Sequence, residues 1–257
     1  MDTAKQFFEE YVRDRRGQHI DGYTLEDLGY LVRYTTHTAA DDFVVFSRLQ
    51  PSAVKSIIDD QLAYFRAKRK SFEWKVYGFD EPGNLESLLI EQGFASDKKE
   101  VLMVCSVNDR APSETHSGSW ELRRVETEQG VSDAVSVQKR VWNKDFEWLA
   151  DHLLNRLIKQ PEQISIYCAY VKGKPVGTGW TCFYSGSKFP ELNGGAVLPE
   201  FRGRGIYKAL YGQRLVEAAN RGYQQITVDA SPMSRPILEK MGFMHVCSTT
   251  PLYYKIA

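Results

Sequence analysis

The residues with the clearest chemical potential lie in the segment 197–207, which reads V-L-P-E-F-R-G-R-G-I-Y. A strand-like run precedes it and a helix-like run, 208–219, comes after it. Gly203 and Gly205 would let the backbone approach a ligand without a Cβ in the way. The N–H groups of a first helical turn lack intrahelical partners and attract anions. The segment therefore predicts a loop that holds a pyrophosphate.

Two arginines strengthen this interpretation, because Arg202 and Arg204 can add charge-assisted hydrogen bonds to a phosphate. A plain turn with a solvated arginine pair is the alternative, since short glycine motifs also match by chance. The setting favours the phosphate loop. Pro199 punctuates the end of the strand, and a second helix downstream stops at Gly242 before a last strand.

This segment resembles the cofactor loop of the GNAT superfamily of acyl-CoA-dependent N-acyltransferases, which reads [R/Q]-x-x-G-x-[G/A]. Arg202 and Gly205 match the motif, whereas Tyr207 stands where the family prefers Gly or Ala. The resemblance covers about residues 119–257. It implies an α/β fold with a mixed sheet splayed at its centre, and acetyl-CoA (coenzyme A) as the cofactor.

The resemblance also implies that the strand before the loop pairs through its backbone with the pantetheine arm. Ser231 replaces an Asn that often precedes the family's last helix, and it could hydrogen-bond the same arm. The expected cofactor-binding residues are Ala196, Val197, Leu198, Arg202, Gly203, Arg204, Gly205, Ile206, Tyr207 and Ser231.

Acidic residues near the loop are candidates for the general base. Glu191 lies eleven residues before Arg202, at the start of the strand. In several members of the superfamily, a glutamate at this place acts as the general base. A solvated glutamate at a strand start is an equally weighted alternative. Asp229, on the next strand, is a second candidate for base or amine anchor, and a water relay would need neither residue alone.

The acid that protonates the leaving thiolate is harder to place. The family often has a Tyr near the start of its last helix, and this chain has Leu238 there. Tyr253, Tyr254 and Tyr207 could each supply a phenol, and Tyr254 is taken as the candidate. A thiolate can also leave unaided, because its pKa is modest.

Aromatic residues flank the region expected to receive the amine, although core packing is the more common use of such side chains. They are Trp142, Trp148, Trp180, Phe183 and Tyr184. No concentrated acidic cluster indicates a polyamine or a lysine-rich tail as acceptor. We therefore expect the amine of a small molecule or a peptide.

Composition limits the other function classes. Among 257 residues, 33 basic residues balance 33 acidic ones, which argues against nucleic acid as the main partner. No apolar run is long enough to span a bilayer, and the N-terminal residues lack a signal-peptide core. The cysteines and histidines lack metal-site spacing, so no metal is expected. We expect reduced cysteines, a cytoplasmic location and no membrane partner, with a homodimer left open.

A polar stretch at residues 109–118 reads as a linker and divides the chain. Residues 119–257 are expected to form the acetyltransferase domain. Its predicted strands are 120–125, 164–171, 175–183, 192–197, 225–229 and 247–256, and its predicted helices are 132–141, 147–159, 208–221 and 235–241.

The N-terminal residues 1–108 contain a partial echo of that order. Strands are predicted at 43–48, 72–77 and 100–106, and helices at 53–68 and 85–91. The helix that ends at Gly93-Phe94 parallels the one that ends at Gly242-Phe243. The connection 49–52 has no glycine and no arginine, so a phosphate loop is missing. We interpret this part as a degenerate GNAT-like domain that shapes the acceptor cleft, with a chance echo as the alternative.

These observations predict direct transfer of an acetyl group from acetyl-CoA to an amine in a ternary complex, where orientation supplies much of the rate. The alternative is a non-catalytic acyl-CoA-binding or sensing module. It is suggested by Leu238, by Tyr207 and by the N-terminal half without a loop.

Overall fold

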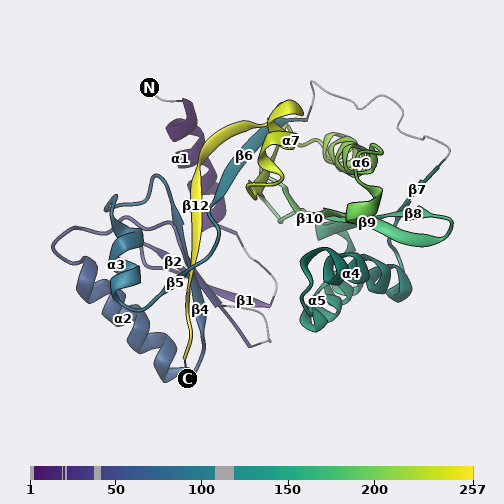
Figure 1. Cartoon of the computed structure of the whole chain (residues 1–257). Coiled ribbons are helices and arrows are strands. Elements are labelled where there is room, and N and C mark those ends of the chain that lie inside the picture. The colour runs from purple at the N-terminus through teal and green to yellow at the C-terminus, as the bar shows by residue number, and fades with distance from the viewer. Residues whose placement is uncertain (1–2, 19, 21, 38–41, 108–118, 257) are drawn as a thin grey trace. The chain divides into compact units, whose positions relative to one another are not determined.

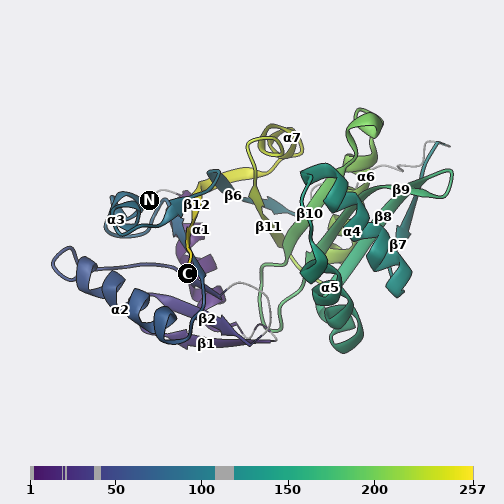
Figure 2. The same ribbon diagram turned by 60° about the horizontal axis from the view of Figure 1, so that its bottom comes forward.

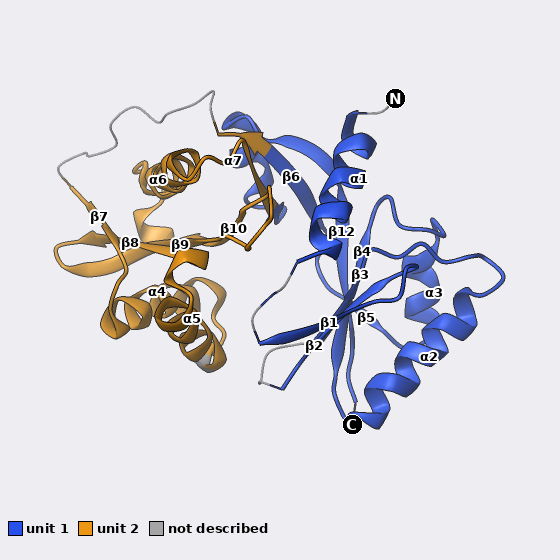
Figure 3. Cartoon of the chain, turned by 180° about the vertical axis from the view of Figure 1, so that it is seen from behind, with its two compact units in different colours: residues 1–104, 229–257 blue, residues 105–228 orange. Residues whose placement is uncertain are grey.

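The structure, a computed structural model, describes residues 3–18, 20, 22–37, 42–107 and 119–256. It divides into two compact units, which Figure 3 shows in different colours. Unit 1 comprises residues 1–104 and 229–257, and unit 2 comprises residues 105–228. Each unit is described by itself.

Unit 1 is built on an antiparallel and parallel sheet that runs in the order β1-β2-β3-β4-β12-β6, with β5 also paired to β12. Its strands are β1 (Tyr23–Asp27), β2 (Val32–Thr36), β3 (Asp42–Val45), β4 (Phe72–Tyr77), β5 (Ala95–Ser96), β6 (Glu100–Ser106) and β12 (Met244–Tyr254). Its helices are α1 (Thr3–Arg16), α2 (Val54–Ala67), α3 (Leu85–Glu91) and α7 (Arg235–Lys240). Figure 1 traces these elements from purple to blue and again in yellow.

Helix α2 illustrates why these segments fold as they do. Its buried side chains Val54, Ile58, Leu62 and Phe65 recur every three or four residues, which places them on one helical face. That face packs on β4, where the Phe65 and Phe72 rings stack with centroids 3.9 Å apart. The helix is therefore fixed by its apolar stripe.

Unit 2 has a sheet in the order β11-β10-β9-β8-β7, antiparallel except for the parallel pair β10 and β11. Its strands are β7 (Glu121–Arg124), β8 (Ile164–Val171), β9 (Lys174–Cys182), β10 (Glu191–Val197) and β11 (Gln225–Ala230), the last of which runs into unit 1. Its helices are α4 (Glu128–Trp142), α5 (Glu147–Lys159) and α6 (Ile206–Asn220), with short 3-10 turns at Pro161–Gln163 and Pro199–Phe201. Helix α6 covers one face of the sheet, and α4 and α5 cover the other (Figures 1 and 2).

Most of the predicted elements are confirmed, and five of them have the predicted bounds: 72–77, 85–91, 100–106, 147–159 and 164–171. Helix α1 and the hairpin of β1 and β2 were not predicted. None of the helices in the described part of the chain is long and apolar enough to cross a membrane.

The last residues of the chain, 229–257, which the sequence places in the domain at 119–257, are grouped with the N-terminal residues in unit 1. The reason is strand β12, which pairs antiparallel with β4 from Thr249↔Tyr77 to Tyr254↔Phe72. The expected linker 109–118 lies outside the described residues.

Helices α3 and α7, whose sequences end alike, also end alike in the backbone. Helices α3 and α7 both end at a glycine of positive φ, Gly93 at 94° and Gly242 at 89°. The N–H of Phe94 donates to the carbonyl of Leu89 at 3.1 Å, and that of Phe243 donates to Leu238 at 3.0 Å. Both helices thus end in the same left-handed C-terminal turn.

Candidate functional site

Strands β10 and β11 of unit 2 separate almost as soon as they meet. They share one registered pair, Glu191 with Thr227, and the Thr227 N–H donates to the Pro190 carbonyl at 2.9 Å. Beyond that pair, no registered pair joins β10 to β11 in the described part of the chain. Since backbone N–H and C=O groups need partners, this open edge can receive an extended ligand as if it were a strand.

The middle of β10 is bulged, because its register with β9 shifts between Asn193 and Ala196. Gly194 has φ +59°, and a Cβ there would lie 1.8 Å from the Trp180 ring, so only glycine fits. The Gln138 side-chain amide donates to the Gly194 carbonyl at 2.5 Å. The bulge is therefore held from both sides, by the Trp180 indole and by a buried amide.

The loop after β10 keeps its ligand-facing side open. The Arg202 Nε donates to the Val197 carbonyl at 3.1 Å, which folds the chain back on the strand end. Gly203 and Gly205 have φ of +75° and +81°, and a Cβ at either would meet no atom within 4 Å. Helix α6 begins at Ile206, with the left-handed Gly205 as its N-cap. Exposed N–H groups at this helix start suit an anion.

The charges around the loop favour the same ligand. Arg202 and Arg204 are exposed. The Arg204 side chain donates to the Glu200 carbonyl at 3.1 Å, while the Arg204 carbonyl accepts from the Trp120 indole at 3.1 Å. The nearby carboxylate of Glu200 is paired with Arg140 at 2.8 Å. Among the described residues, Glu200 is thus paired with Arg140, while Arg202 and Arg204 bind backbone carbonyls of the loop.

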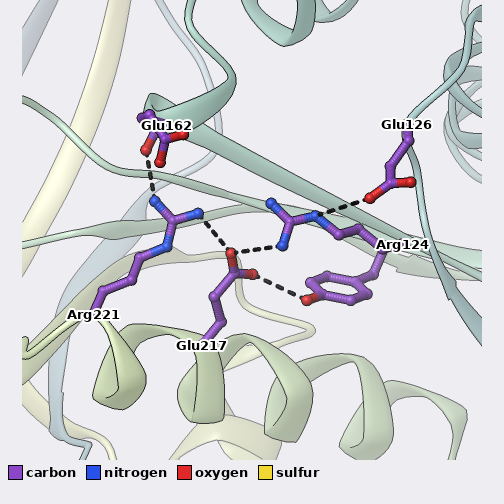
Figure 4. Close-up of polar contacts among 6 residues, drawn as sticks. Arg124, Glu126, Glu162, Glu217 and Arg221 are labelled. Atoms are coloured by element: carbon purple, nitrogen blue, oxygen red, sulfur yellow. Dashed lines mark hydrogen bonds and ion pairs between the residues drawn. The ribbon is translucent and has the colours of Figure 1, made fainter.

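Helix α6, which presents the loop, is anchored by a polar cluster (Figure 4). Glu217 is nearly buried and accepts from the Tyr167 hydroxyl at 3.0 Å and from Arg221 at 2.7 Å. Arg124 lies 3.3 Å from the same carboxylate. Burial alone would raise the pKa of Glu217, but the hydrogen bond from Arg221 and the charges of Arg124 and Arg221 outweigh it, so the pKa lies below its ordinary value. The ionised cluster therefore ties α6 to β7 and β8.

Glu191, the expected base, is the first residue of β10, at the end where this strand pairs with β11, and lies in the same unit as the loop. Its carboxylate is half-buried and accepts from the Tyr184 hydroxyl at 3.2 Å. Asn193 donates to the Glu191 carbonyl at 3.3 Å, and Arg156 donates to the Cys182 sulfur at 3.1 Å. The Glu191 carboxylate therefore lies among polar side chains.

Asp229 belongs to unit 1, where it forms an ion pair with Lys75 of β4. Burial lowers the pKa of Lys75, but the carboxylates of Asp229, Glu73 and Glu100 outweigh it and raise that pKa above its ordinary value. Burial in turn raises the pKa of Glu100 to about 7. Asp229 therefore belongs to a charged cluster with Lys75, Glu73 and Glu100.

Two further expected residues also lie in unit 1. The Ser231 hydroxyl accepts from the Ser234 N–H at 3.2 Å, just before helix α7. The Tyr254 hydroxyl accepts from Arg66 at 2.5 Å, and its ring lies 5.2 Å from that of Phe94. Leu238, in the position of the family's usual acid, is 1% exposed and packs in the interior. These residues belong to a different compact unit from the loop.

Among the expected aromatic residues, Phe183 is buried and Trp142 and Trp148 are largely exposed. Two residues that contact the β10 bulge were not singled out in the sequence, Gln138 and Arg214. Both are polar side chains buried within otherwise apolar helical faces. That interruption of an apolar face is the signal that could have found them.

A mixed sheet that opens between two parallel strands, next to a glycine bulge and an arginine-glycine loop at a helix N-terminus, is the architecture of acyl-CoA-dependent acyltransferases. Residues 127–243 match the family model described as the Acetyltransferase (GNAT) family. No curated protein sequence matches the chain.

Solved structures show the same fold over nearly the whole chain. A GCN5-related N-acetyltransferase from Kribbella flavida has a TM-score of 0.70 and 15% identity, covering 98% of this chain and 95% of that one. Another from Sphaerobacter thermophilus has a TM-score of 0.62 and 16% identity, covering 96% and 85%. A tandem GNAT protein from the clavulanic acid biosynthesis pathway has a TM-score of 0.63 and 10% identity, covering 93% and 85%. The chain thus shares its fold with these proteins over nearly its whole length.

Proposed function

We propose that this protein is an N-acetyltransferase that moves an acetyl group from acetyl-CoA to an amine of a small molecule or peptide. The observation that carries the proposal is the junction of β10 and α6. This junction contains an open strand edge, a glycine bulge and the unobstructed first turn of a helix. Acetyl transfer as such agrees with the family of residues 127–243.

The residues present fit acetyl-CoA. Gly203 and Gly205 leave open space at the start of α6, where the diphosphate would lie, and Arg202 and Arg204 would pair with it. The backbone of Ala196, Val197 and Leu198 would hydrogen-bond the pantetheine arm, and Ser231 is kept as a further candidate for that arm. When bound, the cofactor supplies an acetyl group activated as a thioester.

Glu191 is proposed as the base that receives the proton of the amine. Its position at the start of the open strand, with Tyr184 holding the carboxylate, supports this role. Asp229 is better suited to anchoring charge than to proton transfer, because Lys75 already engages it. Tyr254 is kept as the sequence-based candidate for the acid, and its bond to Arg66 favours a structural role instead.

The proposed domain division is a degenerate GNAT-like domain at 1–108, a linker at 109–118 and the acetyltransferase domain at 119–257. In this division, the acetyltransferase domain contributes its last strand, β12, to the sheet of unit 1. The degenerate domain would then complete its sheet with a strand from its neighbour. We propose that its role is to shape the acceptor cleft.

A non-catalytic acyl-CoA-binding module is the second candidate. It is favoured by Leu238, a buried apolar side chain where the family usually has its acid. The two proposals differ in one observable, since a sensor binds acetyl-CoA without releasing free thiol on any amine.

The experiment is calorimetric titration of the protein with acetyl-CoA, and then a thiol-release assay with a panel of small amines and peptides. We expect the Gly205→Asp variant to lose affinity at least 100-fold, because a carboxylate would stand where the diphosphate binds. Gly173→Asp is the matched control, since Gly173 also has a positive φ (+75°) and open space but lies in the β8–β9 turn. Equal affinity of wild type and Gly205→Asp would contradict the proposed site.

A further inference from the structure

Tyr207 is the residue at which the loop departs from the motif it resembles, and the proposed function gives its phenol no role. Tyr207 lies two helical turns before Arg214 on α6, so both side chains leave the same face of the helix. A Cβ on Gly195 would lie 3.2 Å from Tyr207 Cε2, 3.4 Å from its hydroxyl oxygen and 3.6 Å from Arg214 Nη2. Phenol and guanidinium therefore both lie against the β10 bulge.

Arg214 is a buried cation without a carboxylate partner among the described residues, and it is 2% exposed. Its Nε donates to the Leu210 carbonyl at 3.0 Å. Its Nη1 donates to the carbonyls of Trp180 and Asn193, each at 3.3 Å. A buried charge that is compensated only by carbonyl dipoles is costly to fold, which calls for a role at this position.

The two carbonyls that Arg214 binds define that role. Asn193 is the last β10 residue in register before the bulge, and Trp180 of β9 lies opposite it. Gly179 completes the arrangement, because a Cβ there would lie 2.9 Å from the Arg214 guanidinium carbon. Arg214 thus fixes the bulge and holds a positive charge beside the Tyr207 hydroxyl.

We propose that Tyr207 is the catalytic acid of the acetyl transfer and that Arg214 is its positioning residue. This inference rests on the proposed function. It assigns to Tyr207 the proton donor for the leaving thiolate, which the apolar Leu238 cannot supply. The hydroxyl lies beside Gly195, directly before the three residues whose backbone is proposed to bind the pantetheine arm. The donor of a proton to the departing sulfur is required at this end of the arm.

The proton balance closes with residues of this chain. The amine nitrogen forms a bond to the acetyl carbon and gives a proton to the Glu191 carboxylate. The carbon–sulfur bond breaks, its electron pair goes to sulfur, and the Tyr207 hydroxyl gives that sulfur a proton. The resulting phenolate and protonated carboxyl group are restored by transfer of one proton through solvent.

The environment suits such a group in both of its states. Burial raises the pKa of Tyr207, so the phenol keeps its proton until the sulfur requires it, while the Arg214 charge acts in the opposite direction. After transfer, the same guanidinium stabilises the phenolate. An acid of this kind contributes about 100-fold or more to the rate.

The first test uses Tyr207→Phe and Arg214→Gln, with Tyr211→Phe as the matched control. Tyr211 is a buried tyrosine of the same helix, whose hydroxyl contacts the Cys105 sulfur at 3.6 Å. For Tyr207→Phe, kcat should fall about 100-fold with the KM for acetyl-CoA within about twofold. Acetyl thioesters of increasingly acidic thiols should narrow the difference from wild type, since their sulfur leaves without a proton.

The second readout does not require turnover. The tyrosinate absorbance of wild type minus that of Tyr207→Phe, recorded during an alkaline titration, isolates the ionisation of Tyr207. Its midpoint should rise in Arg214→Gln, and CoA should shift it in wild type. A Tyr211→Phe variant should show the same CoA-dependent shift as wild type.

The outcomes separate the two proposals. A wild type that binds no acetyl-CoA overturns both. A wild type that turns over while Tyr207→Phe retains its kcat, or a Tyr207 midpoint that CoA does not move, overturns the acid and leaves the acetyltransferase intact.

Discussion

Each unit contains two parallel strands connected through a helix, β3–α2–β4 in unit 1 and β10–α6–β11 in unit 2. The two junctions differ in how many residue pairs join their strands. In unit 2, β10 shares one registered pair with β11 and then opens. In unit 1, β3 keeps three pairs with β4, from Asp42↔Phe72 to Val44↔Trp74. One junction therefore offers a free strand edge and the other does not.

At the closed junction, that of β3 and β4, hydrogen bonds continue to join the two segments after the strands end. The N–H of Ser47 donates to the Asp80 carboxylate at 3.1 Å, and the N–H of Tyr77 donates to it at 2.9 Å. The N–H of Glu81 donates to the Ser47 carbonyl at 2.9 Å. Asp80 thus accepts from two backbone donors at the closed junction. In the proposed function, the open junction binds the cofactor instead.

The first residues of the two strands show the same contrast. Asp42 begins β3 at 1% exposure, accepts from the Thr36 N–H at 2.8 Å and lies 3.5 Å from Lys70. Glu191 begins β10 and is half-buried beside the Tyr184 hydroxyl. The same acidic position serves structure in one unit and is proposed to serve proton transfer in the other.

The largest effect should come from neutralising the two acidic positions in turn. Glu191→Gln should lower kcat about 100-fold with little change in acetyl-CoA affinity, because an amide cannot take the amine's proton. Asp42→Asn should leave both kinetic constants within about twofold and lower the midpoint of denaturant unfolding. Steady-state kinetics and calorimetry distinguish the variants. Equal kcat values for Glu191→Gln and wild type would show that Glu191 does not act as the base.

The next effect concerns the seal of the closed junction. Asp80→Ala should lower the free energy of unfolding by about 2 kcal/mol, because it leaves the Ser47 and Tyr77 N–H groups without an acceptor. Acetyl-CoA affinity should not change. Denaturant unfolding and calorimetry measure the two quantities, and a loss of affinity without a loss of stability would contradict the assignment.

Asp80 also predicts a pH dependence. Burial raises its pKa to about 8 in the folded state. An unfolded aspartate titrates near about 3.9. The folded state therefore binds the extra proton between these values, so its contribution to stability is lost as pH rises through about 8. Asp80→Asn should lack this slope, which unfolding curves from pH 5 to about 9 would reveal.

A smaller effect is expected from the cluster that anchors α6. Glu217→Gln should lower the free energy of unfolding by about 1 to 2 kcal/mol at neutral pH, since it removes a charge-assisted acceptor from Arg221 and Arg124. The folded pKa of Glu217 is depressed, so its contribution is present above the unfolded value and is lost as pH falls through the folded one. The difference between wild type and variant should therefore shrink in acid, and a difference that grows there would refute the ionised cluster.

The smallest effect should come from the exposed loop charges. Arg204→Gln should weaken acetyl-CoA binding about threefold at low salt, and the difference should fade as salt screens the exposed guanidinium. The equivalent change in the closed junction, Arg48→Gln, should have no effect on binding. Calorimetry at two ionic strengths measures both, and a salt-independent loss in Arg204→Gln would indicate a structural effect instead.

Much of this site could be predicted locally. The loop, its strand and its helix are contiguous in sequence, and glycine at a positive φ leaves a recognisable pattern at Gly203 and Gly205. The helix end shared by Gly93 and Gly242 was visible for the same reason. Local backbone requirements restrict residue type strongly enough to be read from one chain.

Long-range features were not predicted, because their cause lies far away in sequence. Nothing near Asp229 indicates that Lys75 will pair with it, and nothing in β12 indicates β4 as its neighbour. Helix α1 was missed because its charged residues hide the few apolar side chains, Phe8, Tyr11 and Val12, that it buries. Pairing across the chain depends on packing that no short window contains.

Strand β12 has a consequence for how the protein is made. Its pairing with β4 joins residues between which a ribosome must synthesise the whole of unit 2. The sheet of unit 1 therefore waits, with β4 lacking one neighbour, until residues 244–254 have left the exit tunnel. A stop codon before residue 244 removes β12, so the sheet of unit 1, whose synthesis began first, should fail to form.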